Sequence, residues 1–114
     1  MELVNLTPHA VMIVADDDVV ATIAPSGGVA RARQSDHQVG AVMVDGFAVP
    51  VVKTVFGEVE DLPVPTEGIA YIVSFITVSA ARAQGRPTHD LLTTSGPVRD
   101  ADGRIIGCCA LARN

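Results

Sequence analysis

The stretch that decides the fold reads Ile69-Ala70-Tyr71-Ile72-Val73-Ser74 and runs on through residues 75–84. Its first five residues are a near-continuous apolar run, which is typical of a buried central strand. Ser74 is a favourable helix N-cap, so residues 75–84 predict a helix that ends at Gly85. Residues 76–78 are β-branched and favour a longer strand instead, so the two alternatives compete at this point.

Most of the remaining chain consists of short strand-forming segments between turn residues. Residues 10–15 and 19–23 flank three aspartates and predict a hairpin. Residues 41–44 and 47–55 flank Asp45-Gly46, the strongest hairpin signal in the chain. Pro50 limits the second of these strands to a sheet edge or a bulge.

The other segments are predicted from their composition. We expect a basic strand at residues 29–33, a polar loop at 34–39, an exposed connection at 57–68, turns at 86–97 with a short strand at Leu91-Leu92, and a closing hairpin of 98–99 with 104–111. The predicted fold is therefore α+β. It is a single domain over residues 1–114, a mostly antiparallel sheet of six to eight short strands with one helix at about 75–84.

Length and composition exclude several classes of protein. The chain has 114 residues, 48% of them hydrophobic and 18% charged, which is typical of one globular domain. No apolar run approaches eighteen residues and the first five residues do not resemble a signal peptide, so we expect a cytoplasmic protein that does not contact a membrane. A net charge of −5 argues against binding to duplex nucleic acid.

The two cysteines, Cys108 and Cys109, are adjacent. A disulfide between neighbours is strained, and neighbouring side chains in a strand point to opposite faces. We therefore expect reduced thiols, one buried and one facing outward.

The basic residues are seven arginines and one lysine, and five of the arginines lie in residues 82–114, where the local charge is positive. The guanidinium group suits phosphate or carboxylate ligands. If the last turn spans residues 100–103, Arg99 and Arg104 face each other across the hairpin, which favours an anion between them. If the turn is only Asp102-Gly103, Arg104 pairs with Ala101 and that argument weakens. Asp100 or Asp102 neutralising the two arginines is the simpler alternative.

Two further segments offer polar groups for a ligand. A helix that starts at Ser74 directly after a buried strand presents free N–H groups to an anion, although Ser74 can equally be an ordinary cap. In Asn5-Leu6-Thr7-Pro8-His9, the side chains of Asn5, Thr7 and His9 either gather around a ligand or serve the local turn.

Metal and catalytic motifs are weak. The three histidines are scattered, and the calcium-like Asp100-x-Asp102-Gly103 lacks the glutamate that the twelfth position needs, so we expect no metal and no cofactor. The chain has no Gly-x-Ser-x-Gly, Walker or Gly-x-Gly-x-x-Gly motif. A Cys109 nucleophile with His9 or His89 as base stays open as an alternative to a structural cysteine.

Several motifs together resemble a known group of proteins. They are Asn5 to His9, Pro25-Ser26-Gly27 before Val29-Ala30-Arg31, Thr54-Val55-Phe56-Gly57-Glu58-Val59, Tyr71-Ile72-Val73-Ser74, and Gly96-Pro97-Val98-Arg99-Asp100 with Gly103-Arg104-Ile105-Ile106-Gly107-Cys108. They span nearly the whole chain and are similar to those of small phage, prophage and actinobacterial proteins that open with Asn-Leu-Thr-Pro-His.

The size, the α+β make-up and the placing of the arginines also resemble the Thoeris anti-defence sponge family. Those phage proteins bind immune signals of the cyclic ADP-ribose type as oligomers and do not cleave them. The resemblance implies that Arg31, Arg99 and Arg104 hold the diphosphate and that Phe75 stacks on adenine, although so few aromatic residues argue against base stacking.

From these observations we expect a non-catalytic, homo-oligomeric protein that sequesters a small phosphorylated nucleotide. Arg31, Arg99 and Arg104 would neutralise phosphates, Ser74 and Thr7 would add hydrogen bonds, and His9 would add a donor that gains charge as the pH falls. The alternatives are a small nucleotide-acting hydrolase or transferase, and a structural phage component whose arginines form salt bridges between subunits.

Overall fold

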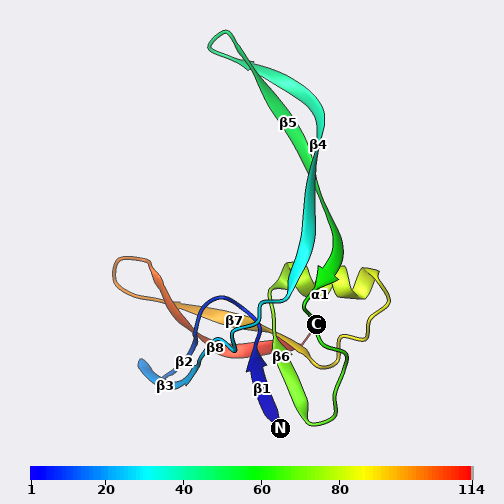
Figure 1. Ribbon diagram of the computed structural model, residues 1–114. Coiled ribbons are helices and arrows are strands. Elements are labelled where there is room, and N and C mark those ends of the chain that lie inside the picture. The colour runs from blue at the N-terminus through cyan, green and yellow to red at the C-terminus, as the bar shows by residue number, and fades with distance from the viewer. Residues whose placement is uncertain (114) are drawn as a thin grey trace.

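The computed structural model describes residues 1–113 and confirms the α+β prediction. The elements are β1 (Glu2–Asn5), β2 (Val11–Ala15), β3 (Asp18–Ile23), β4 (Arg31–Val44), β5 (Phe47–Glu60), β6 (Ile69–Ile72), α1 (Phe75–Ala83), β7 (Leu91–Arg99) and β8 (Ile105–Arg113). Six strands and α1 form a body, and β4 with β5 forms a separate long hairpin (Figure 1). Within residues 1–113, no helix is long and apolar enough to cross a membrane.

The six-stranded sheet has the order β1-β6-β7-β8-β2-β3. The three hairpins, β2–β3, β4–β5 and β7–β8, are antiparallel and contain most of the paired residues. The pairings of β1 with β6, β6 with β7 and β2 with β8 are parallel, so the sheet is mixed. A bridge between Asn5 and Pro25 joins the end of β1 to the chain just after β3, so the two edge strands of the sheet approach each other there.

The helix forms where the capping residues predict it. The Ser74 side chain accepts a hydrogen bond from the Thr77 N–H at 3.2 Å, which caps the first turn. Gly85 follows the C-cap with a φ of 82°, a backbone conformation that glycine adopts without strain. Tertiary contacts therefore stabilise the helix despite its β-branched residues, because Thr77 and Val78 are buried against the sheet.

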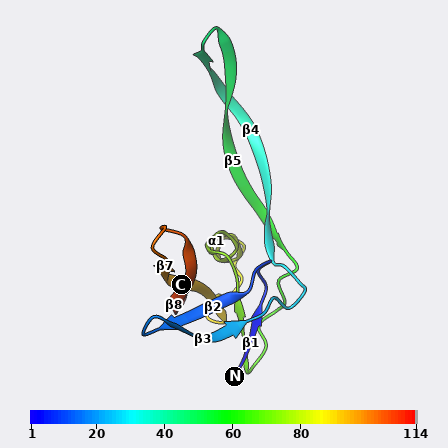
Figure 2. The same cartoon turned by 90° about the vertical axis from the view of Figure 1, so that its left-hand side faces the viewer.

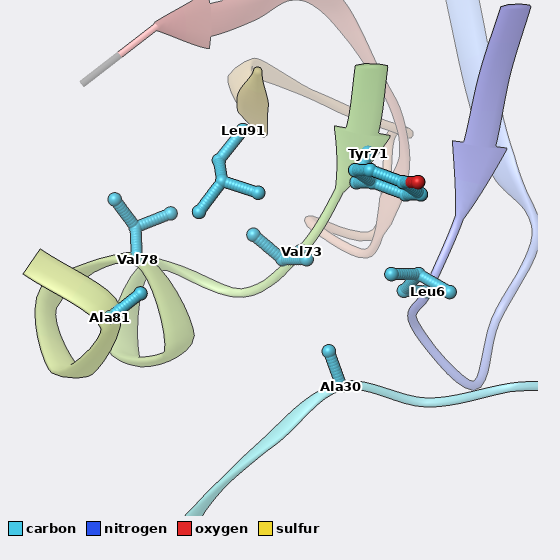
Figure 3. Close-up of a cluster of buried hydrophobic side chains, with 7 residues drawn as sticks. All are labelled: Leu6, Ala30, Tyr71, Val73, Val78, Ala81 and Leu91. Atoms are coloured by element: carbon cyan, nitrogen blue, oxygen red, sulfur yellow. The ribbon is translucent and has the colours of Figure 1, made fainter. Parts of the chain in front are cut away.

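The core lies on both sides of β6. Side chains of β6 and the residue after it alternate between the two faces, as expected for a strand with both faces covered. On the face towards α1, seven buried residues pack together (Figure 3): Leu6, Ala30, Tyr71, Val73, Val78, Ala81 and Leu91. On the other face, Ile72 packs with Val11 and Cys108. The core side chains are mostly small.

The β4–β5 hairpin corrects the predicted loop at residues 34–39. Those residues belong to β4, because each polar residue there has a cross-strand partner in β5, such as Asp36 opposite Thr54 at 2.8 Å between side-chain oxygens. The predicted turn at Asp45-Gly46 is confirmed, and both residues have positive φ. Figures 1 and 2 show the hairpin extending away from the body, so we call its outer part, residues 38–52, the arm.

The base of this hairpin is fixed to α1. The Gln84 side chain donates to the Gly57 carbonyl at 2.9 Å, and Thr77 Oγ1 donates to the Ala30 carbonyl at 3.3 Å. Val59 packs against the helix-side core. The direction of the hairpin is therefore set by contacts at its base.

The last hairpin differs from its prediction in two ways. The strand is not limited to Leu91-Leu92, because β7 continues to Arg99 through pairs such as Thr94 with Leu111. Arg99 lies opposite Ile105, and Asp100 shares a backbone hydrogen bond with Arg104. Neither predicted register occurs, so the argument from two opposed arginines no longer holds.

The cysteine prediction is confirmed. Cys108 and Cys109 are both free, and they lie on opposite faces of β8, with Cys108 buried and Cys109 exposed. Cys108 Sγ lies 3.7 Å from the Met12 carbonyl oxygen, where β8 approaches β2. Cys108 thus behaves as a small core residue.

The buried ion pair of Arg86 and Asp90 closes the loop between α1 and β7. The guanidinium donates to both carboxylate oxygens at 2.9 and 3.0 Å and to the Pro63 carbonyl at 2.7 Å. Burial raises the pKa of Asp90, but the hydrogen bonds and positive charge of Arg86 outweigh it and lower that pKa overall.

Asp90→Asn should reduce the free energy of unfolding at neutral pH by about 3 kcal/mol, because it leaves the Arg86 charge buried without its partner. Since the Asp90 pKa is lowered on folding, this contribution is present at neutral pH and is lost as the pH falls through the folded-state pKa, below 3.8. Urea unfolding at several pH values measures both effects. Glu60→Gln, which breaks the exposed Arg33–Glu60 pair, should cost less than about 1 kcal/mol; equal losses would contradict this assignment.

Gly107 allows β8 to approach β2 closely. A Cβ at this position would lie 2.7 Å from the Met12 carbonyl oxygen and 2.8 Å from Val14 Cγ2. Gly107→Ala should therefore cost about 2 kcal/mol in thermal or urea unfolding, because backbone has to move. Gly28→Ala, where a Cβ makes only an ordinary contact with Leu6 at 3.8 Å, is the matched control and should change stability by less than about 0.5 kcal/mol. A harmless Gly107→Ala would show that the β2–β8 contact is looser than described.

Candidate functional site

Two cavities meet at the start of α1. The larger, about 640 Å³, lies between the β1–β2 connection, the end of β6 and the β7–β8 hairpin. Its lining is mainly apolar and includes the side chains of Thr7, His9, Ser74, Thr94 and Ser95. The smaller, about 300 Å³, lies between residues 6–8, the start of β4 and the first turn of α1. Thr7 and Ser74 line both cavities, so these two residues stand at the junction.

The turn that carries Thr7 is built around Asn5. The Asn5 amide nitrogen donates to the His9 carbonyl at 2.9 Å and to the Ile23 carbonyl at 3.0 Å. Its amide oxygen accepts from the Thr7 N–H at 3.0 Å and from the Thr7 hydroxyl at 2.6 Å. Asn5 is therefore the structural centre of the turn, and the interpretation of this residue as serving the local turn is confirmed.

The hydrogen bonds around Asn5 leave Thr7 and His9 with groups that can still bond a ligand. The half-buried Thr7 hydroxyl has one proton, which it shares among Asn5 and the His9 carbonyl, but its lone pairs can still accept a hydrogen bond. The exposed His9 holds the turn through its carbonyl group, and its side chain lines the larger cavity. Thr7 thus lies at the junction of the cavities and His9 lines the larger one, both on a turn that the Asn5 side chain holds.

The helix N-terminus contributes donors to the same place. The N–H groups of Phe75 and Ile76 lie in the first turn, where no intrahelical acceptor exists. Ser74 Oγ is 2.9 Å from Thr77 Oγ1, so the cap is shared between two hydroxyl groups. The positive end of the helix dipole thus lies beside Thr7.

Arg31 brings a full positive charge to the smaller cavity. It begins β4 and lines this cavity together with Phe56, which the β4–β5 register brings opposite Gln34. Arg33, two residues on, instead pairs with Glu60 at 3.1 Å. The smaller cavity therefore combines a cation, an aromatic ring and the first turn of α1.

The other predicted ligand residues lie elsewhere. Arg99 donates to the Gly103 carbonyl at 2.8 Å, and the Asp100 carboxylate accepts from the N–H groups of Asp102 and Arg104. The loop that holds them is at the far left of Figure 1, away from α1, and neither arginine lines either of these two cavities. Phe75 is 63% exposed and also lines neither.

Thr94, Ser95 and Phe56 are among the lining residues that the sequence does not predict. Thr94 and Ser95 lie in a segment that was assigned to turns, and β7 carries them to the wall of the larger cavity. Phe56 could have been found only from the long register of β4 with β5, which the predicted loop at residues 34–39 concealed.

The nucleophile and the bases considered for catalysis, Cys109 with His9 or His89, do not line either of the two cavities together. His9 and Cys108 line the larger cavity, but Cys108 is buried against β2, and the exposed Cys109 lines neither cavity. No cluster of three or more metal-binding side chains occurs among residues 1–113.

Comparisons of the chain with protein-family models, with curated proteins and with solved structures found no match.

Asn5→Asp tests whether the side-chain amide of Asn5 holds the turn that carries Thr7 and His9. The change is nearly isosteric but replaces the donor that binds the His9 and Ile23 carbonyls with a charged acceptor, so we expect a loss of about 3 kcal/mol in urea unfolding at neutral pH. Ser26→Ala, which removes one long hydrogen bond at an exposed position nearby, should change stability by less than about 0.5 kcal/mol. Similar stabilities for the two variants would show that the turn does not depend on the Asn5 amide.

Proposed function

We propose that this protein binds a small phosphorylated nucleotide and holds it without cleaving it, as an oligomer in the cytoplasm. The observation that carries the proposal is the junction at Thr7 and Ser74, where a mainly apolar cavity meets a cavity that contains Arg31. A nucleotide has the same sequence of chemical parts, with an apolar base, a hydroxyl-bearing ribose and an anionic phosphate.

The larger cavity suits the base and the ribose. Pro97, Ile105 and Ile106 supply exposed apolar surface, and a hydroxyl of the Thr94-Ser95 pair can bond a sugar. A volume of about 640 Å³ is in the range of small-molecule sites.

The junction and the smaller cavity suit the phosphate. The free N–H groups of the first turn of α1 and the Arg31 guanidinium both favour an anion. His9, which lines the larger cavity, adds a hydrogen-bond donor near the junction.

Binding without turnover fits the way the hydroxyl groups are used. The Thr7 hydroxyl bonds within its own turn, and the Ser74 hydroxyl caps α1 and lies 2.9 Å from that of Thr77. Their hydrogen bonds shape the turn and the helix start, so we assign these hydroxyls to positioning a ligand.

Cyclic ADP-ribose isomers are the first ligands to test, because the resemblance to phage anti-defence sponges implies them, and cyclic dinucleotides are the second. Isothermal titration calorimetry should detect binding to the wild-type protein. Arg31→Ala should weaken it at least about tenfold, since it removes a charged hydrogen bond. Arg33→Ala is the matched control, because Arg33 is paired with Glu60 and lines neither cavity, and it should bind as the wild type does.

The other outcomes separate the alternatives. Loss of binding in Arg99→Ala or Arg104→Ala, with Arg31→Ala unaffected, would move the site to the β7–β8 loop. Chromatography of the ligand after heat denaturation of the protein distinguishes binding from catalysis, because a sequestering protein releases the ligand intact. Absence of binding for every ligand at micromolar protein concentration would contradict the proposal.

A further inference from the structure

The arm, residues 38–52, has an unusual surface for a segment that projects into solvent. Asp45 at the turn is its only charged residue. Large apolar side chains are exposed along its whole length, with Phe47 exposed to 74%. The exposed set is Val39, Val42, Met43, Val44, Phe47, Val49, Val51 and Val52.

The register of the hairpin sorts these side chains into two faces. Val44 lies opposite Phe47 and Val42 opposite Val49, and Val51 continues the same face of β5. We call this the valine face; Val55 extends it towards the body. Lys53 and His37 lie opposite each other on the same face, at its inner end. The valine face is thus an apolar strip with an acid at its tip and two basic side chains at its base.

The arm cannot bury this strip by itself. A two-stranded hairpin has no core of its own and is marginally stable in water. Figures 1 and 2 show that the outer part of β4 and β5 stands clear of the sheet and of α1 in both directions of view. The arm therefore needs another surface to cover the valine face.

We propose that the valine face packs against the valine face of a second copy of this chain, with the two arms antiparallel. Asp45, at the turn, and the His37–Lys53 pair lie at opposite ends of the strip. A two-fold axis midway between them, between the Val42–Val49 and Ala41–Pro50 pairs, therefore brings Asp45 of each copy to the level of Lys53 and His37 of the other. Parallel arms would instead place like charges side by side.

The outer edge of β5 argues for a closed dimer rather than a growing sheet. The Ala41–Pro50 pair is next to the Val42–Val49 pair. Counted from the two-residue turn at Asp45-Gly46, Val42–Val49 is a hydrogen-bonded pair and Ala41–Pro50 is a non-hydrogen-bonded pair, whose backbone nitrogens point outward from the ribbon. The edge thus lacks an N–H donor where a further strand would bind. Face-to-face packing does not need this edge.

The valine face would form the oligomer of the proposed function. Dimerisation through this face requires no ligand, so the dimer and the nucleotide binding can fail separately. Sedimentation equilibrium without nucleotide should give the mass of a dimer for the wild-type protein. The triple variant Val42→Thr/Phe47→Thr/Val49→Thr, which keeps strand-forming side chains at two β-branched sites, should be a monomer. Val19→Thr/Val20→Thr on β3 replaces equally exposed valines of the body and should stay a dimer.

A double-mutant cycle between Asp45 and Lys53 tests the antiparallel arrangement, because these variants leave the apolar strip intact. Lys53→Glu should weaken the dimer about tenfold through repulsion from Asp45 of the other copy, and Asp45→Asn in the same chain should restore much of that loss. Within one arm the two side chains lie at opposite ends of the strip, seven positions apart along the hairpin, so their coupling reports a contact between copies. A monomeric wild-type protein, an undiminished dimer in the triple variant, or no coupling between Asp45 and Lys53 would each overturn the proposal.

Discussion

The hydrogen bonds of the Asn5 side chain hold together the parts on which the rest of the structure depends. This side chain is 1% exposed and bonds the end of β3, the carbonyl of His9 and both the N–H and the hydroxyl of Thr7. The backbone of the same residue bridges to Pro25. One amide group therefore joins the two edge strands of the sheet and places Thr7 beside the N-terminus of α1, where the two cavities meet. Among small core side chains, such a polar group contributes much of the specificity of the fold.

The elements that were predicted well have strong local signals. The apolar run before Ser74 and the cap itself predict β6 and α1, and Asp45-Gly46 predicts a hairpin turn. The elements that were missed depend on distant partners. Polar residues 34–39 form a strand only because β5 pairs with them, and β1 is a strand because it lies parallel to β6, more than sixty residues away. Local composition carries no information about such pairings.

The candidate site was predicted in part, because some of its residues belong to local turn and cap motifs and others come together only in the fold. Thr7, His9 and Ser74 were identified from turn and cap chemistry, and the structure brings them together with Arg31 around the two cavities. Arg99 and Arg104 were chosen because positive charge accumulates towards the end of the sequence. In space they lie on the β7–β8 loop, where the Arg99 guanidinium donates to the Gly103 carbonyl and the Asp100 carboxylate accepts from the backbone N–H of Arg104. Neither arginine lines the two cavities described above.

The central claim is that the junction at Thr7 and Ser74 receives the phosphate of a nucleotide while the larger cavity receives its base. A crystal structure of the protein soaked with a cyclic ADP-ribose isomer tests this claim most directly. The account predicts phosphate density within hydrogen-bond distance of Arg31 or of the first-turn N–H groups of α1. Phosphate density at the β7–β8 loop, with both cavities filled only by water, would contradict it.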